Sequence, residues 1–400
     1  MTILDLPDTT TWTDLLADIA AGAKDRDLDD VNPFDQVAAL KRAGFGTLRL
    51  PTELGGAGVT VPQLFSAVID VARADPVVAH IFRTHFWFVE ERLRTLDQPG
   101  SRTWLQKVAD GKVFGNAFSE KGSHAVGSLV FNTRLAPGHD GGFTLTGEKF
   151  YSTGTLFSDY LTVTATTDHD SVAIVIVPAD RAGVTIIDDW DGFGQRRTGT
   201  GTTRFQDVTV LPDEVLSDTP YDAEPVPSVQ YTLLQLYIHA VVAGILENIV
   251  DDGIALLRSR ERSFSHASAA SPTDDPLLQR QLGELASSAY IARAAVLDAA
   301  AAIAAAIDST GPDGVPDAEL TAQAQLQAAK VKVHLDDIAP RAATKLLELG
   351  GASAASRQRN LDRHWRNIRT ITLHNPVGYK ARVVGQNLLH GTAIPANAYF

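Results

Sequence analysis

The chain has 400 residues and a net charge of −13 at pH 7, with 35 Lys and Arg against 48 Asp and Glu. The length predicts more than one domain, and a composition of 44% hydrophobic and 21% charged residues is typical of a folded soluble protein. The negative charge argues against binding to nucleic acid or to an anionic membrane. The absence of cysteine excludes disulfides, thiolate nucleophiles and iron–sulfur clusters.

No segment is typical of a targeting or membrane-spanning sequence. The start of the chain carries Asp5 and Asp8 but no Lys or Arg, unlike a secretory signal. The longest apolar stretch runs from Ala299 to Ile307, far short of the roughly 20 residues that span a bilayer. We therefore expect a soluble, cytoplasmic protein.

The N-terminal zone has helical periodicity. Apolar residues recur at three- and four-residue spacing at Trp12, Leu15, Leu16 and Ile19. The pair Asn32-Pro33 predicts a helix with Asn32 as its cap and Pro33 at its first position. The glycine-rich segment 53–58 predicts a loop, which is either a plain connector or an active-site lid.

The middle of the chain changes to strand character. Short runs rich in β-branched residues, at 142–146, 160–164 and 172–177, are separated by Gly, Asp and Pro. Because no long helical stretches lie between successive strands, the pattern favours an antiparallel sheet or barrel over a parallel βαβ sheet.

From about residue 228 the chain is helical again. Alanine-rich segments at 291–307 and 320–349 predict long helices in an antiparallel bundle. The predicted domains are residues 1–112 (helical), 113–217 (β barrel) and 218–400 (helical bundle). The fold class is α+β, mostly α.

Common catalytic motifs are missing. The sequence has no dinucleotide-binding Gly-x-Gly-x-x-Gly at a strand–helix junction, no Walker A motif, no Gly-x-Ser-x-Gly and no His-Glu-x-x-His. Glu-x-x-His is also absent, which disfavours a di-iron site in the bundle. We expect no metal site.

A basic segment stands out in this acidic chain. Between Arg357 and Arg382 there are seven Lys and Arg residues against Asp362 alone. The segment either binds an anion or holds arginines that pair with acidic neighbours. His374 precedes Asn375-Pro376, where a helix is predicted to end, and a histidine there can act as an acid or base near neutral pH.

Several segments together resemble one family. Residues 362–376, Asp-Arg-His-Trp-Arg-Asn…Thr-Leu-His-Asn-Pro, are similar to the C-terminal signature of two-component flavin-dependent monooxygenases with the acyl-CoA dehydrogenase fold. Segments 115–120, 147–154 and 189–201 resemble that family's flavin-contacting segments. The resemblance covers nearly the whole chain. It implies an N-terminal α domain, a central antiparallel β barrel, a C-terminal four-helix bundle and a homotetramer.

The resemblance also assigns site residues. It implies a flavin lined by Asn116, Ser119, Ser152, Trp190 and Thr200. Arg262, with Phe264 beside it, would contact the flavin phosphate of a neighbouring subunit, and Ser353 replaces an arginine near that phosphate. The residues with catalytic roles would be His374, His80, Asn116 and Ser152. Thr84, His85 and Ile371 are assigned to the substrate pocket, because Thr84 and Ile371 replace an aromatic hydroxyl and a second histidine of the dibenzothiophene-oxidising members.

The implied activity is oxygenation of a small organic molecule at sulfur, nitrogen or an aromatic carbon. It would use O2 and reduced FMN, with FAD as the alternative flavin, through a C4a-hydroperoxyflavin. No nicotinamide motif is present, so a separate NAD(P)H:flavin reductase is expected.

Two other functions stay open. An acyl-CoA dehydrogenase needs a carboxylate base. Here one family position is taken by the stretch ending at His374, and residues 231–246 contain no Asp or Glu, which disfavours dehydrogenation. The other alternative is a catalytically silent flavin-fold protein.

Overall fold

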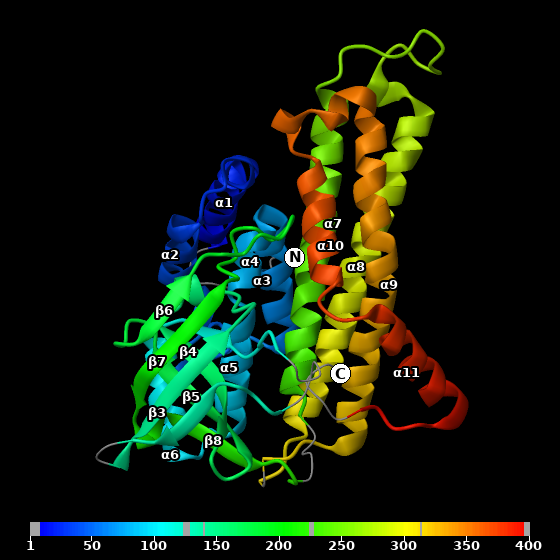
Figure 1. Ribbon diagram of the computed structural model, residues 1–400. Coiled ribbons are helices and arrows are strands. Elements are labelled where there is room, and N and C mark those ends of the chain that lie inside the picture. The colour runs from blue at the N-terminus through cyan, green and yellow to red at the C-terminus, as the bar shows by residue number, and fades with distance from the viewer. Residues whose placement is uncertain (1–8, 123–128, 139–140, 224–227, 313, 396–400) are drawn as a thin grey trace.

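The computed structural model describes residues 9–122, 129–138, 141–223, 228–312 and 314–395. The acidic start at Asp5 and Asp8 lies outside these residues. In the described part, a helical N-terminal region and a strongly twisted sheet lie on one side of a long helical bundle (Figure 1). The predicted order of helices, strands and helices is confirmed.

The N-terminal helices are α1 (Thr9–Asp29), α2 (Phe34–Arg42), α3 (Val61–Ala74), α4 (Pro76–Ile81), α5 (Arg83–Arg94) and α6 (Pro99–Ala109). Helix α3 begins with a capping box, in which the side chains of Thr60 and Gln63 each accept the other's backbone N–H. The predicted cap at Asn32 is wrong. Helix α2 begins at Phe34, and the Asn32 amide instead donates to Asp188 at 3.0 Å, joining this region to the sheet domain.

The sheet contains β1 (Phe114–Ala117), β2 (Arg134–Pro137), β3 (Phe143–Lys149), β4 (Tyr160–Thr167), β5 (Ser171–Pro178), β6 (Val184–Ile187), β7 (Thr202–Val210) and β8 (Val215–Pro220). Its order is β6-β7-β3-β2-β4-β5-β8, and β1 also pairs with β4. The pairings are antiparallel except β1–β4 and β2–β4, which are parallel. Strand β8 continues to Pro220, so the predicted boundary at residue 217 falls inside it.

The bundle consists of α7 (Gln230–Arg258), α8 (Pro276–Asp308), α9 (Ala318–Gly350) and α10 (Asp362–Thr372), and α11 (Val377–His390) projects from its side (Figure 1). Aspartates cap two of these helices: Asp275 accepts the N–H of Leu277, and Asp317 accepts that of Glu319. Buried alanines such as Ala292 let α8 approach its neighbours closely.

Helices α7 and α8 are each long and apolar enough, by length and composition alone, to cross a membrane. In α7 83% of the apolar window is buried, because this helix packs against α3, α8 and α9. In α8 only 33% is buried. The apolar sequence of α7 is therefore explained by the core, whereas much of α8 is left uncovered by the single chain.

The arginines of α10 pair with carboxylates from other helices. Arg363 lies 2.6 Å from Asp252 of α7, and Arg366 lies 2.8 Å from Asp27 of α1. His364 also contacts Asp252, at 2.7 Å. The arginines Arg363 and Arg366 of the basic segment therefore pair with acidic neighbours and join α10 to other helices. This is the alternative to anion binding that the sequence left open.

Candidate active site

Two predicted site histidines lie where α4, the segment 192–201 and the turn between α10 and α11 meet. His80 of α4 is 9% exposed, and its Nδ1 lies 2.9 Å from Oε1 of Gln195. The backbone N–H of Gln195 donates to Asn367 of α10 at 2.7 Å. Burial, reinforced by the charge of Arg83, lowers the pKa of His80 to about 4. With Nδ1–H donating to the Gln195 carbonyl oxygen, Nε2 of His80 is a buried acceptor.

His374 follows the end of α10, as the sequence predicts. Its Nε2 lies 3.3 Å from Nη1 of Arg83, which also donates through Nε to the carbonyl of Leu234 on α7 at 2.9 Å. A guanidinium has no acceptor, so Nε2 of His374 accepts and the ring proton sits on Nδ1. The residue as a whole is exposed in the single chain, yet desolvation by surrounding protein and the charge of Arg83 hold the pKa of its ring well below the usual value. His374 is therefore neutral at physiological pH.

Asn116 of β1 and Thr84 of α5 are joined directly, with the Thr84 hydroxyl donating to Oδ1 of Asn116 at 2.7 Å. An aromatic cluster is formed by residues of α5, of α7 and of the chain just after β1. The Trp87 ring is 5.3 Å from Phe118 and 6.0 Å from Tyr231 of α7, between ring centroids. Trp87, Phe118 and Tyr231 thus form one aromatic cluster.

Ser152 precedes a tight turn against α4. At Gly154 an added Cβ would lie 2.6 Å from the carbonyl oxygen of Ile81, so this turn requires glycine to pack so closely. The Ser152 side chain is fully buried, and its hydroxyl has no partner among the described residues. The Thr200 hydroxyl, by contrast, contacts the hydroxyls of Thr153 and Thr198 at 2.8 and 2.7 Å.

Trp190 and Ser119 border the same region. The indole N–H of Trp190 donates to the carbonyl of Gly194 at 3.1 Å, and its ring packs edge-on against Tyr151. Ser119 is exposed, and its carbonyl accepts the N–H of Phe150. These contacts link the three predicted flavin-contacting segments, 115–120, 147–154 and 189–201.

The buried polar side-chain atoms around this site that have no hydrogen-bond partner in the part of the chain that the structure describes include Nε2 of His80, Oγ of Ser152, Nε2 of Gln195 and Oδ1 of Asn375. Such atoms are few in native proteins, because each costs about 1–3 kcal/mol. The set contains both donors and acceptors. A ligand with alternating ring N–H, ring nitrogen and carbonyl groups would satisfy it, and the isoalloxazine of a flavin has this pattern.

The structure places the other predicted residues elsewhere. Arg262 and Phe264 lie in the connection between α7 and α8 at the tip of the bundle, where Phe264 is 66% exposed. Ser353 lies after the end of α9, with its hydroxyl donating to Gly350. Ile371 is buried in the main core. In a single chain, Arg262, Phe264 and Ser353 are not grouped with His80 and His374, whereas the backbone carbonyl of Ile371 accepts the N–H of His374 at 3.1 Å.

The assignment of His85 to the substrate pocket is wrong. Its Nε2 contacts the carbonyl of Gly46 at 2.8 Å, and its Nδ1 accepts the N–H of Phe114 at 3.3 Å. The ring is fully buried, and burial lowers its pKa to about 4. Both ring nitrogens serve the backbone, so His85 is a core residue.

Three site residues escaped the sequence analysis. Arg83 was not identified because nothing in the sequence links it to His374. Gln195 and Asn375 lie inside the recognised segments but were not singled out. Gln195 has a backbone φ of 52°, which is uncommon outside glycine and is a sign of a constrained position.

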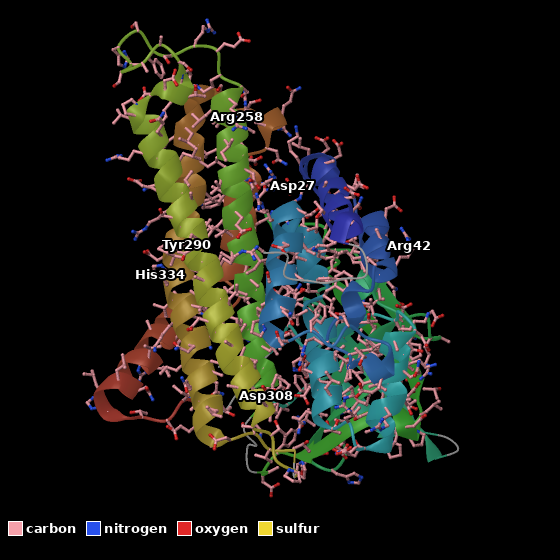
Figure 2. The ribbon with its side chains drawn as sticks, turned by 180° about the vertical axis from the view of Figure 1, so that it is seen from behind. Asp27, Arg42, Arg258, Tyr290, Asp308 and His334 are labelled. Atoms are coloured by element: carbon pink, nitrogen blue, oxygen red, sulfur yellow. The ribbon has the colours of Figure 1, made fainter. Side chains whose placement is uncertain are left out.

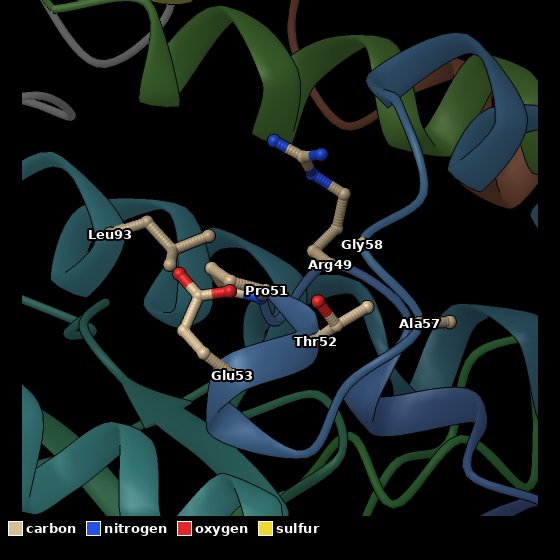
Figure 3. A pocket seen from close by; sticks show the side chains of 7 residues that line it. All are labelled: Arg49, Pro51, Thr52, Glu53, Ala57, Gly58 and Leu93. Carbon is tan, nitrogen blue, oxygen red and sulfur yellow. The ribbon is translucent and has the colours of Figure 1, made fainter.

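A separate pocket of about 410 Å³ surrounds the glycine-rich loop (Figure 3). It is lined by Arg49, Pro51, Thr52, Glu53, Ala57, Gly58 and Leu93, none of which belongs to the site described above. Arg49 extends away from Glu53 in this view and is anchored by Glu90 at 2.5 Å and by the carbonyl of Val59. The anchoring of Arg49 beside this loop favours the interpretation of segment 53–58 as a plain connector rather than an active-site lid.

Comparison with known proteins agrees with this geometry. Residues 116–208 match the model of the acyl-CoA dehydrogenase middle domain, and residues 236–378 match that of the acyl-CoA dehydrogenase C-terminal domain. The FMN-bound crystal structure of TdsC from Paenibacillus sp. A11-2 superposes with a TM-score of 0.88 at 29% identity, covering 98% of this chain and 99% of that one.

Two curated proteins are similar over most of their length. Dibenzothiophene monooxygenase of Rhodococcus erythropolis is 31% identical over 364 residues, which are 88% of this chain and 86% of the relative. The probable FMNH2-dependent monooxygenase SfnC of Pseudomonas putida is 28% identical over 396 residues, which are 97% and 95%.

The fold and the site define a flavin-dependent oxidoreductase of the acyl-CoA dehydrogenase fold. Within that class, the chain belongs to the family of dibenzothiophene monooxygenase and related FMNH2-dependent monooxygenases. The predicted fold, the monooxygenase class and FMN as the cofactor are confirmed. The dehydrogenase alternative is disfavoured.

Proposed function

We propose that this protein oxygenates a small, uncharged organosulfur compound with O2 and reduced FMN from a separate NAD(P)H:flavin reductase. The observation that carries the proposal is the group of unpaired buried polar atoms beside the neutral His374. In the balanced reaction, a thioether, O2 and reduced FMN give a sulfoxide, water and oxidised FMN in equal amounts. Bound reduced FMN supplies the two electrons that split O2.

The chain's own residues orient the flavin. Ser152 and Gln195 offer a hydroxyl and an amide N–H, while His80 and Asn375 offer acceptors, all of them without partners in the described chain. A flavin that pairs with these groups gains hydrogen bonds without displacing protein–protein ones. Asn116, Ser119, Trp190 and Thr200 are proposed to line the same cofactor from the sheet domain.

His374 is proposed to handle the proton. Arg83 occupies its Nε2, so Nδ1–H is its only proton to donate. The low pKa keeps the ring neutral, and a ring whose proton is held at one nitrogen can donate to a reacting oxygen and recover a proton afterwards.

The aromatic cluster is proposed to face the substrate. Trp87 of this cluster lies one turn after Thr84 on α5, and Thr84 is small where the dibenzothiophene-oxidising relatives are expected to carry an aromatic hydroxyl. Apolar aromatic walls exclude water and suit a polarisable, uncharged sulfur compound. Ile371 would border this side from α10.

We propose that the protein is a homotetramer. We also propose that it acts in the cytoplasm, where NAD(P)H for the reductase is made. Helix α8 exposes Leu277, Tyr290 and Ile291, and Figure 2 shows Tyr290 and His334 together on the face turned away from the sheet domain. A second copy that covers this face would bury these apolar side chains. We further propose that the neighbouring subunit brings Arg262 and Phe264 to the flavin phosphate, with Ser353 nearby.

The test combines product analysis with one variant pair. Reduced FMN or reduced FAD is bound anaerobically, and each complex is mixed with 18O2 and dibenzothiophene, a cyclic amine or a phenol. We expect 18O in the sulfoxide with FMN. His374→Ala should lower product formation by about 10²–10⁴-fold while FMN still binds. His169→Ala, a change at an exposed histidine outside the site, is the control. Flavin oxidation that yields only hydrogen peroxide with every substrate would contradict the proposal.

A further inference from the structure

The interior of the bundle holds ionisable side chains that the proposed reaction does not use. Lys332 of α9 is 2% exposed, and its Nζ lies 2.6 Å from Oδ2 of Asp336 one turn further along the helix. Oδ1 of Asp336 lies 3.3 Å from Nε2 of His239 on α7, which is 1% exposed. Buried charges are costly unless they are paired, so this cluster needs a reason to be retained.

The cluster is connected to the turn that carries His374 at two points, one before and one after the histidine in the chain. Before the histidine, Nζ of Lys332 donates to the carbonyl of Thr372 at 3.3 Å. After it, the amide of Asn375 donates to Oε1 of Gln235 at 3.0 Å, and the backbone carbonyl of Gln235 lies 3.1 Å from Nδ1 of His239. A continuous set of buried polar contacts therefore runs from Thr372 to Asn375 through α9 and α7.

The distances identify the cation that balances Asp336. His239 faces two acceptors, the Gln235 carbonyl and the Asp336 carboxylate, so its ring satisfies both only when it is protonated. Burial opposes this form and lowers the pKa of His239. The ammonium of Lys332 is also the nearer group, at 2.6 Å against 3.3 Å. Lys332 is thus the counter-ion of the cluster.

We propose that Lys332 is a positioning residue for His374, which it holds in place by anchoring the turn at Thr372 and, through Asp336, His239 and Gln235, at Asn375. The inference rests on the proposed role of His374. If the turn shifts, the histidine loses its alignment with Arg83, and Asn375 no longer presents its unpaired oxygen to the site. Lys380 of α11, whose pKa is lowered to about 7 by burial and by the charge of Lys332, is a further ionisable group near this cluster.

The test separates positioning from folding. Lys332→Met alone leaves Asp336 buried without its cation, so this variant is expected to be less stable. The double variant Lys332→Met/Asp336→Leu removes both charges and is expected to recover thermal stability, but it still lacks the bond to Thr372. Lys330→Met, at an exposed position two residues away on the same helix, is the matched control.

Two measurements follow on the full-length protein. In the flavin-free protein with 13C-labelled histidine, the His374 resonance, assigned with His374→Ala, should shift and titrate differently in the double variant. In turnover, the hydrogen peroxide released per FMNH2 consumed should rise at least about three-fold.

A stable double variant with the wild-type His374 resonance and wild-type peroxide release would overturn the proposal. If even the wild-type protein forms no oxygenated product, the proposed function fails, but the His374 resonance still decides whether Lys332 positions the turn.

Discussion

Arg83 and His374 come from segments 291 residues apart, and Nη1 of Arg83 lies 3.3 Å from Nε2 of His374. The same guanidinium donates to the carbonyl of Leu234 and so holds the start of α5 against α7. One side chain therefore fixes the tautomer of the histidine, disfavours its charged form and ties its position to the bundle.

This relationship predicts a change in pH dependence. Replacing Arg83 by Met removes the adjacent positive charge, so the pKa of His374 should rise toward its ordinary value. As the pH falls, the neutral, active form of His374 would then be lost at a higher pH than in the wild-type protein. The acid limb of the product-formation profile should move to higher pH, with about two- to four-fold less product at pH 6. Arg83→Lys retains the charge and should keep the limb near its wild-type position. An unmoved limb in Arg83→Met would contradict the assignment.

Replacing Ser152 by alanine is predicted to raise the stability of the flavin-free protein but to weaken FMN binding. Because its buried hydroxyl has no partner among the described residues, Ser152→Ala should raise the free energy of unfolding of the flavin-free protein by about 1 kcal/mol. FMN affinity should fall by about 3–10-fold through loss of one hydrogen bond. Urea denaturation and fluorescence titration measure the two effects.

The control for Ser152 is Ser158, whose hydroxyl donates to Gly154 at 2.8 Å. Ser158→Ala should lower stability by about 1 kcal/mol and leave FMN affinity unchanged. If both serine variants lose FMN affinity equally, Ser152 has no special role at the flavin.

The close approach of Gly194 to the backbone of α10 leads to a prediction about stability and FMN binding. A Cβ at this position would lie 2.2 Å from the carbonyl oxygen of Arg366, so Gly194→Ala must push the segment 192–201 away from α10. We expect a loss of about 1–3 kcal/mol in stability and weaker FMN binding, because Gln195 moves with the segment. Gly378→Ala, in open space on α11, should be neutral or slightly stabilising. Equal melting temperatures for the two variants would rule out this contact.

The contacts of Asp252 with Arg363 and His364 predict how the free energy of unfolding varies with pH. Although burial opposes its ionisation, hydrogen bonds from His364 and Arg363 lower the pKa of Asp252 to about 2. A depressed carboxyl pKa stabilises the fold above the unfolded-state value, and this contribution disappears as pH falls toward 2. Asp252→Asn should therefore cost about 2 kcal/mol at pH 7 and clearly less at pH 3. Asp308→Asn, at the exposed end of α8 in Figure 2, should change stability by less than about 0.5 kcal/mol at both pH values.

Most of the fold was predictable because its elements have strong periodicity. The runs that begin at Tyr160 and Val172 became β4 and β5, and the alanine-rich segments became α8 and α9. Local rules failed where a distant partner intervened. Asn32 was predicted to cap α2, but Asp188, far along the chain, takes its amide. The excess charge of α10 left an anion site and arginine–carboxylate pairs both open, and only the structure shows that Asp252 and Asp27 of other helices balance Arg363 and Arg366.

The site was predictable only in part. The recognised segments contain His374, Asn116 and Ser152, whose surroundings now support their proposed roles. His85 was misassigned because its neighbours Gly46 and Phe114 come from other elements. The contacts of Arg83 and Lys332 are with residues far along the chain, so their own sequence neighbourhoods gave no signal.

The sequence by itself determined the order of helices and strands, the absence of cysteine chemistry and the family, because periodicity, composition and short motifs are properties of neighbouring residues. Only the tertiary structure decided which polar atoms stay unpaired, which cation balances which carboxylate and which partners face the ring nitrogens of His80 and His374. These properties depend on distances between residues far apart in the chain. A shift of about 1 Å is enough to make or break a hydrogen bond, so packing, rather than residue identity, decides the chemistry of this site.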